Sequence, residues 1–536
     1  MKLLTADQMR EVDRLTTERY SIPGILLMES AAVSVVEAAE RKFGALDGKH
    51  AQIICGKGNN GGDGAAIARR LWMRGSKVDL ILLGRIGDTR GDAKINFDIA
   101  RSLASTQGSA LRIIETIDSD QLQQEFANAS PDIYFDAIFG TGLARPATGI
   151  FEKAISLINQ AGKNRPVIAV DIPSGLSSDS HELIGPAVHA HLTVTFTAPK
   201  IANLLPPASE FGGELIVAQI GSPEELIASS DSHLALVRRE AVAQWLRDSR
   251  RSPQANKGDA GKALIIAGSR GKTGAACLAG EGALRAGAGL VTIATPQSAL
   301  SVVASQSMSE CMTEPLAETS SGSVSSEAAA RALELASERD VVAIGPGLGS
   351  AEETTRAFVR EVIVNRSRPM VLDADALNSL APWDGQIRGG EEHPLILTPH
   401  PGEMARLTGK TISEVLTNRI EVAREFAKAN QLILVLKGSR SLIAAPDGEI
   451  YINPTGNAGM ATGGTGDVLT GIVAGLLAQK LDNPVAATVA AVYLHGFAGD
   501  IAASRRGMRS MVASDIALCL SDAFIEIGGE EQRVVR

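Results

Sequence analysis

The chain has few cysteines and no excess of basic charge. Its 536 residues include 4 cysteines, and none lies in a Cys-x-x-Cys or Cys/His metal-binding spacing. We therefore expect small buried thiols in a reducing compartment. Lysine and arginine total 52 against 61 acidic residues, a net charge of −9. This balance argues against nucleic acid as a partner, because a general nucleic-acid grip needs a basic face.

Long apolar segments are also missing. The N-terminus turns polar too early for a signal peptide, and no unbroken apolar run approaches the roughly 18 residues that cross a bilayer. We expect a cytoplasmic protein without a membrane partner. Hydrophobic residues make up 44% of the chain, and its 54 glycines follow no repeat. This composition indicates a globular α/β enzyme of roughly two to four domains.

A glycine-rich segment, residues 453–467, runs directly into an apolar stretch that starts at Val468. A glycine-rich loop that opens a helix directs backbone N–H groups and the positive end of the helix dipole at one point, which suits a phosphate. Asp467 is the only acid of this loop, and a carboxylate repels a phosphate. It fits a base that deprotonates a hydroxyl about to be phosphorylated. An N-cap of the helix is the alternative.

The N-terminal half begins with two predicted helices, over residues 5–43 with a break at 21–24, because the apolar positions follow a helical period. A strand, a glycine-rich loop, a helix and a second strand follow, over residues 52–55, 56–64, 65–74 and 78–83. The loop matches the dinucleotide fingerprint, but the second strand ends without the acid that binds a ribose. Asn59, Asn60 and Asp63 suit a polar ligand or a hard cation. A purely geometric role of the asparagines in the turn remains open.

Polar side chains follow the ends of several strands in this half. The later strands are predicted over residues 133–139, 167–170, 192–196 and 214–220. In an open parallel sheet the carboxyl ends of the strands share one edge, where ligands bind. Oxygen atoms of Asn60, Asp136 and Ser174 would suit a monovalent or other hard cation at that edge. Asp171 would remain free as an acid/base.

The chain resembles the YjeF N-terminal family at residues 58–64, 136, 140–143 and 171–175. Members of that family are NAD(P)HX epimerases, which interconvert the R and S forms of a hydrated nicotinamide cofactor. The resemblance implies an epimerase domain over residues 1–225, folded as a Rossmann-like three-layer sandwich. It implies catalysis by Asp171 and a potassium ion on Asn60, Asp136 and Ser174. It also implies that the hydrate is bound by Asn59, Asn60, Gly61, Gly62, Asp63, Gly140, Thr141, Gly142, Leu143, Ala144, Arg145, Pro146 and Asp171.

The second half follows a serine- and acid-rich segment, 221–232, where we expect the domain junction. Buried strands that end in polar or glycine-rich loops are predicted over residues 262–267, 290–294, 341–344, 369–372, 395–397 and 432–436. His400 lies between two prolines, and both ligand contact and a structural role remain open. Lys437 is a candidate counter-charge for a phosphate. Asp373 and Asp375 are candidates for Mg²⁺, with helix capping as the alternative for Asp375.

A P-loop is excluded at Lys272 and Thr273, because Ile266 stands where that motif needs a glycine. The second half instead resembles the YjeF C-terminal family of the ribokinase-like fold, at residues 257–261, 345–347, 372–375, 398–403, 436–438 and 453–467. The resemblance implies a three-layer α/β/α dehydratase domain over residues 226–536. It implies hydrate contacts from Ala276, Gly347, His400 and Asp467. It implies ADP contacts from Lys437, Gly438, Ser439, Arg440, Ser441 and Gly466.

Together the two resemblances cover nearly the whole chain, in the arrangement of bifunctional NAD(P)H-hydrate repair enzymes. They imply NADHX or NADPHX and ADP as substrates, Mg²⁺ with the nucleotide, potassium in the first domain and a homo-oligomer, with a tetramer favoured. Asp467 would deprotonate the ring hydroxyl, which takes a phosphoryl group from ADP and leaves as phosphate. Two alternatives remain. One is a ribokinase-like vitamin-precursor kinase fused to a ligand-binding domain, and the other is a non-enzymatic sensing or scaffold role for the first domain.

Overall fold

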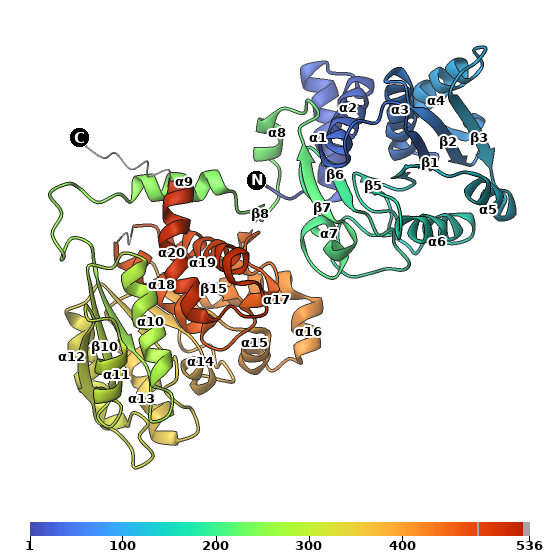
Figure 1. The fold of residues 1–536 in the computed structure, drawn as a ribbon. Helices are drawn as coiled ribbons and strands as arrows, with labels where there is room; N and C mark the ends of the chain where they lie inside the picture. Colours follow the sequence, from blue (N-terminus) through green and yellow to red (C-terminus); the bar gives the residue numbers. More distant parts are fainter. Residues whose placement is uncertain (480–481, 529–536) are drawn as a thin grey trace. The chain divides into compact units, whose positions relative to one another are not determined.

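The structure is a computed structural model that describes residues 1–479 and 482–528. It divides the chain into two compact units, Met1–Ser232 (unit 1) and His233–Arg536 (unit 2). Both units combine helices with a single large sheet (Figure 1).

Unit 1 is built on a seven-stranded parallel sheet in the order β3-β2-β1-β4-β5-β6-β7. The strands are β1 His50–Cys55, β2 Lys77–Leu83, β3 Leu111–Thr116, β4 Ile133–Ala137, β5 Val167–Val170, β6 Leu192–Phe196 and β7 Glu214–Ala218. The strand order reverses between β1 and β4. Ligands bind outside the carboxyl ends of the strands at such a switch point.

Helices cover both faces of this sheet and make unit 1 a three-layer sandwich. They are α1 Ala6–Tyr20, α2 Gly24–Phe43, α3 Asn59–Met73, α4 Gly91–Ala104, α5 Ser119–Asn128, α6 Ile150–Gly162, α7 Ile201–Leu204 and α8 Glu224–Ala228. One face packs against α2, α3 and α4 through a cluster that includes Val35, Ala66 and Phe97. The other face packs against α5 and α6 through Leu122 and Ile155.

The prediction that residues 59–64 form a loop is wrong, because α3 begins at Asn59. Glycine is a poor helix former, but close packing requires it here. A Cβ at Gly61 would lie 1.8 Å from the Gly56 carbonyl oxygen, and one at Gly62 would lie 2.7 Å from the Ala93 Cα. The glycines therefore let the first turn of α3 approach both the end of β1 and helix α4.

Unit 2 contains a ten-stranded sheet in the order β11-β10-β9-β12-β13-β14-β15-β16-β17-β8. The strands are β8 Leu234–Leu236, β9 Lys262–Ile266, β10 Leu290–Pro296, β11 Met312–Leu316, β12 Val341–Ile344, β13 Met370–Leu372, β14 Leu395–Leu397, β15 Ile433–Leu436, β16 Leu442–Ala444 and β17 Ile450–Ile452. Only β16 runs antiparallel to its neighbours among these strands. The parallel strands β9 and β12 to β15 therefore deliver their following loops to one edge.

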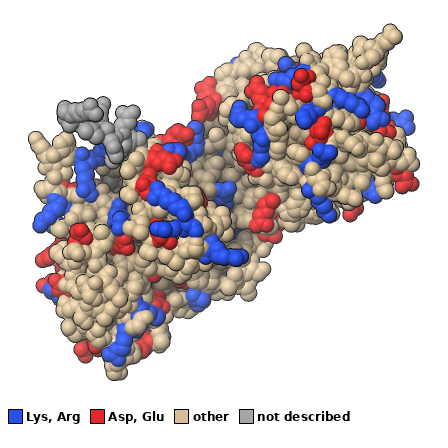
Figure 2. Space-filling model, in the orientation of Figure 1, with Lys and Arg blue, Asp and Glu red and all other residues tan. Residues whose placement is uncertain are grey.

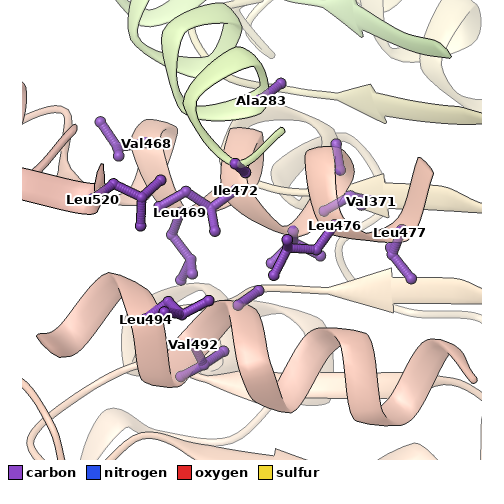
Figure 3. Close-up of a cluster of buried hydrophobic side chains, with 14 of the residues drawn as sticks. Ala283, Val371, Val468, Leu469, Ile472, Leu476, Leu477, Val492, Leu494 and Leu520 are labelled. Carbon is purple, nitrogen blue, oxygen red and sulfur yellow. The ribbon is translucent and has the colours of Figure 1, made fainter. Parts of the chain in front are cut away.

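The helices of unit 2 include α18, which is apolar on nearly every side. They are α9 Arg239–Asp248, α10 Thr273–Arg285, α11 Leu300–Gln306, α12 Ala329–Ser337, α13 Glu353–Val364, α14 Asp375–Ser379, α15 Pro401–Thr408, α16 Ile412–Thr417, α17 Arg419–Asn430, α18 Thr465–Gln479, α19 Pro484–Arg506 and α20 Ala513–Gly528. Ile472 and Leu476 of α18 lie among side chains of α10, α19 and α20 (Figure 3). A Cβ at Gly471 would lie 2.0 Å from the Ala279 carbonyl oxygen, so glycine allows α10 and α18 to pack closely and fixes the start of α18.

Among the described helices, α19 is the one that is long and apolar enough to cross a membrane. The sequence did not predict such a helix, because no unbroken apolar run is long enough. Two thirds of its most apolar window, 67%, is buried inside the structure, as in a core helix of a globular unit.

On the face drawn in Figure 2, basic and acidic side chains are interspersed over both units. The four cysteines are all free.

Candidate active sites

A cavity of about 750 Å³ opens at the carboxyl ends of β1, β4 and β5 in unit 1, and α1 and α2 contribute to its wall. Eight predicted hydrate-binding residues line it: Asn59, Asn60, Asp63, Gly140, Thr141, Gly142, Leu143 and Asp171. The other five do not line it although the structure describes them all: Gly61, Gly62, Ala144, Arg145 and Pro146. The sheet edge thus brings together loops that lie more than a hundred residues apart in the sequence, from residue 59 to residue 171.

Asp171 lies at this edge with a left-handed backbone, φ 70°. A non-glycine residue in that region stores strain, which proteins retain mainly at functional positions. Its Oδ1 accepts hydrogen bonds from Lys200 Nζ at 2.6 Å and Thr195 Oγ1 at 3.0 Å. Its Oδ2 faces Gly140, where a Cβ would lie 3.4 Å from that oxygen and 3.5 Å from the Asn60 Cβ. Asp171 is therefore free at one oxygen only, whereas the sequence predicted a free carboxylate.

The candidate cation ligands lie beside the cavity. Asp136 is fully buried, and its oxygens accept from Ser174 Oγ at 2.6 Å, from Ser174 N at 2.7 Å and from Ile138 N at 3.3 Å. These donors are neutral, and burial raises the pKa of Asp136 to about 6. Both amide atoms of Asn60 are buried without a hydrogen-bond partner. A buried carboxylate with neutral neighbours and an orphaned amide oxygen fit a hard cation.

Further acids face the same cavity, and the sequence did not predict two of them, Asp13 of α1 and Asp92 of α4. Burial, and then the charges of Asp171 and Asp13, raise the pKa of Asp63 well above its ordinary value. Lys200 was also missed. It follows strand 192–196 at the same sheet edge, so the rule that singled out Asp171 could have found it.

In unit 2, Asp467 lies in the first turn of α18. Because α18 begins at Thr465, Asp467 stands inside the helix, and the N-cap alternative is wrong. Burial, and then the charge of Asp373, raise the pKa of Asp467 to about 7, while Lys437 opposes the shift. A carboxyl group that titrates near neutral pH is suited to general base catalysis.

Lys437 and Asp373 meet beside this helix start. Lys437 Nζ donates to Asp373 Oδ1 at 2.7 Å, and Thr470 Oγ1 donates to Asp373 Oδ2 at 2.7 Å. A Cβ at Gly466 would lie 3.2 Å from Lys437 Nζ. The fold therefore places Lys437 at the glycine-rich segment, as the phosphate hypothesis requires, but with a buried carboxylate as its partner.

His400 is the N-cap of α15. Its Nδ1 accepts from the backbone N–H of Gly402 at 3.0 Å and of Glu403 at 3.3 Å, and Glu403 Oε2 accepts from His400 N at 2.8 Å. Burial and Lys437 lower the pKa of His400, and an accepting Nδ1 leaves the ring proton on Nε2. The structural role is present. Nε2 of the half-exposed ring already lies 3.4 Å from Glu403 Oε1, so a ligand would share this N–H with that carboxylate.

The segment 437–441, predicted to bind ADP, is the tight connection from β15 to β16. The buried Arg419 donates to the carbonyl oxygens of Ser439 at 3.0 Å and Arg440 at 2.9 Å. The Arg440 guanidinium in turn donates to the Pro454 carbonyl oxygen. The fold thus ties this connection to the glycine-rich segment 453–467.

The remaining predicted contacts lie around the loop after β12. A Cβ at Gly347, whose φ is 66°, would lie 2.9 Å from the Lys272 carbonyl oxygen and 3.0 Å from the Ala275 Cβ. Ala276 is adjacent in α10, but the whole residue is fully buried. Ala276 therefore presents no exposed surface to a ligand in this structure.

The Mg²⁺ candidates are already engaged. Asp375 does not cap its own helix. Its Oδ2 accepts from Gly349 N at 2.8 Å and lies 3.3 Å from Lys272 Nζ, and both oxygens of Asp373 are bonded as described above. Among residues 1–479 and 482–528, no group of three or more His, Cys, Asp and Glu side chains is arranged to hold a metal ion. The described side chains of unit 2 by themselves therefore do not fit a dedicated Mg²⁺ site.

The two units define an α/β enzyme with two sites. One site has an acid at the edge of a Rossmann-like sheet, and the other has an acid at the glycine-rich start of α18 in a kinase-like unit. Residues 25–202 match the family described as YjeF-related protein N-terminus, and residues 263–521 match the family described as NAD(P)H-hydrate dehydratase. The bifunctional NAD(P)H-hydrate repair enzyme of Moorella thermoacetica is 45% identical over 96% of this chain and 95% of that protein. The Escherichia coli protein of the same description is 33% identical over 95% of this chain and 92% of its own length. The chain belongs to the family of bifunctional NAD(P)H-hydrate repair enzymes.

Several solved structures are similar to about half of the chain. An ADP/ATP-dependent NAD(P)H-hydrate dehydratase from Bacillus subtilis, co-crystallised with ATP and Mg²⁺, is 33% identical. It covers 53% of this chain and 97% of its own, with a TM-score of 0.46.

Proposed function

We propose that the chain repairs hydrated nicotinamide cofactors by two reactions. Unit 1 interconverts R- and S-NAD(P)HX, and unit 2 dehydrates S-NAD(P)HX to NAD(P)H with ADP, giving AMP and phosphate. The observation that carries the proposal is similarity over nearly the full length: the Moorella thermoacetica repair enzyme is 45% identical over 96% of the chain. The alternative, a vitamin-precursor kinase fused to a ligand-binding domain, has no such support, because these full-length relatives are described as bifunctional NAD(P)H-hydrate repair enzymes.

In unit 1, Asp171 moves the proton. Inverting the hydrated carbon requires either loss and return of hydroxide or opening of the ring, and each route needs a group that takes and returns a proton. The Oδ2 of Asp171 faces the cavity beside Gly140, within reach of a hydroxyl bound there. Asn59, Asn60 and Asp63 orient the substrate.

Asn60, Asp136 and Ser174 would hold a potassium ion. This ligand set fits because Asp136 is buried among neutral donors and the Asn60 oxygen has no partner. The ion would supply a fixed positive charge that offsets Asp136 and orders the start of α3.

In unit 2, Asp467 is the base. It takes the proton of the ring hydroxyl, the hydroxyl oxygen bonds to the terminal phosphorus of ADP, and AMP leaves. Backbone N–H groups at the start of α18 and the Lys437 ammonium stabilise the negative charge that develops on the phosphoryl group. The ring nitrogen then expels phosphate, and loss of a proton from the adjacent carbon completes NAD(P)H.

The nucleotide contacts are Lys437 to Ser441 and Gly466, and the hydrate contacts are Ala276, Gly347, His400 and Asp467. Mg²⁺ accompanies the nucleotide. It commonly binds through substrate phosphates with only one or two protein carboxylates, which agrees with the lack of a dedicated site of protein side chains. We also propose a cytoplasmic homo-oligomer, a tetramer, which acts on small molecules and binds neither nucleic acid nor membranes. The four free cysteines suit that reducing compartment.

Incubation of the purified chain with racemic NADHX and ADP tests the proposal. Complete conversion to NADH requires both activities. Conversion that stops at half of the hydrate identifies an inactive epimerase, and no conversion refutes the assignment. A panel of vitamin precursors with ATP in the same assay tests the kinase alternative.

A further inference from the structure

Lys200 is one of the largest fully buried side chains of the described chain, with 0% of its surface exposed. It follows β6 and lines the cavity of unit 1. A buried ammonium is costly unless it is paired and hydrogen-bonded. Its position next to a proton-transfer site calls for an explanation beyond packing.

The three N–H groups of the Lys200 ammonium all have acceptors within the protein. They are Asp171 Oδ1 at 2.6 Å, Thr195 Oγ1 at 2.8 Å and the Phe196 carbonyl oxygen at 3.0 Å. A lysine has three donors and no acceptor, so none remains for a bound substrate. A protonated amine with three partners is also not a nucleophile, which excludes a Schiff-base role.

The same contacts restrict Asp171. Lys200 and Thr195 occupy its Oδ1, and Thr195 accepts from Lys200 while it donates to Asp171. Only Oδ2 remains, directed at the space beside Gly140. The positive φ of Asp171 shows that the surrounding contacts hold the residue against its own backbone preference.

The other charged residues around the cavity are of both signs. Asp13 of α1 and Asp63 of α3 both face it and repel the negative charge of Asp171. The remaining charged residues that line the cavity are Arg10, Arg14, Lys57 and Asp92. Lys200 is the one cation bonded directly to Asp171 among the described residues.

We propose that Lys200 is the positioning residue of the epimerase site, which holds Asp171 by its Oδ1 so that Oδ2 alone is presented to the hydroxyl of the hydrate. The proposal rests on the proposed epimerase function of unit 1. Lys200 touches neither the substrate nor the transferred proton, and acts through Asp171.

The Lys200→Met variant tests this role, assayed as conversion of R- to S-NADHX without ADP so that dehydration does not contribute. We expect kcat to fall about 100-fold, since a well-placed acid/base is worth about 10²–10⁴ in rate. We expect KM to change less than about threefold, because Lys200 has no donor for the substrate. The kcat–pH profile should differ from that of the unaltered chain, because Lys200→Met takes away the one cation bonded to the reacting carboxyl group among the described residues.

Lys42→Met is the matched control. Lys42 also bonds a carboxylate at 2.6 Å, that of Glu214, and a backbone carbonyl, that of His191, at 3.0 Å, but it lies outside the cavity lining. We expect its kcat and pH profile to match those of the unaltered chain. An unchanged profile in Lys200→Met, or the same shift in both variants, would overturn the proposal.

A second variant covers the case in which Lys200→Met unfolds unit 1. Lys200→Ala leaves space for a small cation, so millimolar ethylammonium should restore kcat at least about tenfold, because it resupplies the charge beside Asp171 Oδ1. Absence of rescue in a variant whose unfolding profile matches the unaltered chain contradicts the proposal. Failure of the proposed function is distinguished beforehand, because the unaltered chain would then not epimerise R-NADHX at all.

Discussion

Lys437 Nζ lies 2.7 Å from Asp373 Oδ1, and the second oxygen of Asp373 accepts from Thr470. The lysine assigned to the nucleotide is therefore fixed by a buried carboxylate before any phosphate arrives. A phosphate at Gly466 therefore meets the Lys437 ammonium in a fixed position. The Asp373 carboxylate offsets part of the positive charge of that ammonium. Positioning of this kind lowers the reorganisation needed during phosphoryl transfer.

Asp467→Asn should abolish dehydration and leave epimerisation intact. The amide cannot accept the hydroxyl proton, so we expect dehydration to fall by about 10²–10⁴. Dehydration is measured as NADH formation from S-NADHX with ADP, and epimerisation as conversion of R-NADHX without ADP. Loss of both activities in a folded variant would contradict two independent sites.

The dehydration rate should depend on pH through Asp467. Burial, and then Asp373, raise its pKa to about 7, and the base acts in its deprotonated form. We expect kcat to be level above about pH 7 and to fall about tenfold per unit below it. A profile measured from pH 5.5 to 8.5 at saturating ADP checks this, and a level rate down to pH 5.5 would rule out Asp467 as the titrating base.

Thr470→Val should weaken dehydration by about tenfold while the protein stays folded. The change keeps the side-chain shape but removes the hydrogen bond to Asp373 Oδ2. A hydrogen bond to a charged group is worth about 1.5–3 kcal/mol. Without it Asp373 should hold Lys437 less firmly, and the dehydration rate should fall by part of that free energy. The control is Thr488→Val, since the buried Thr488 hydroxyl bonds only the Pro484 carbonyl oxygen of its own helix among the described contacts. Equal losses in the two variants would mean that the effect is not specific to Asp373.

Epimerisation should depend on potassium through Asp136. In unaltered protein we expect the rate to fall when KCl is replaced by tetramethylammonium chloride, because that cation is too large for a site of buried oxygens. Asp136→Asn should remove most of the response, since the amide carries no charge to balance the ion. Dehydration of S-NADHX by the same samples is the internal control. A response that survives in Asp136→Asn would place the potassium elsewhere.

Gly140→Ala should raise the KM for epimerisation about tenfold without unfolding unit 1. The added Cβ meets Asp171 Oδ2 at 3.4 Å and Asn60 at 3.5 Å, which are ordinary contacts, so the methyl group fits but occupies space between the two residues. Gly87→Ala is the control, because a Cβ there has nothing within 4 Å. An unchanged KM in Gly140→Ala would show that the hydrate does not bind between Asn60 and Asp171.

Much of the strand framework could be predicted from the sequence. Buried parallel strands are continuous apolar runs, and the runs at 167–170 and 341–344 have the bounds that the structure gives to β5 and β12. The strands that were missed include β3, β16 and β17. β3 is only partly buried, and β16 and β17 are three residues long. Such segments carry too few apolar residues for a pattern to show.

The sequence by itself determined the sheet edges, the glycine-rich start of α18 and the acids beside them, because these follow from local chain chemistry and from the rule that parallel strands end at one edge. Only the tertiary structure decided which charges pair. Lys200 reaches Asp171 across 29 residues, and Lys437 reaches Asp373 across 64. Local propensity likewise predicts a loop for the glycines of α3, because it disfavours a helix there. They are helical because they pack against the Gly56 carbonyl oxygen and α4. Contacts between distant residues depend on where the whole fold places each strand end, and no local pattern encodes that.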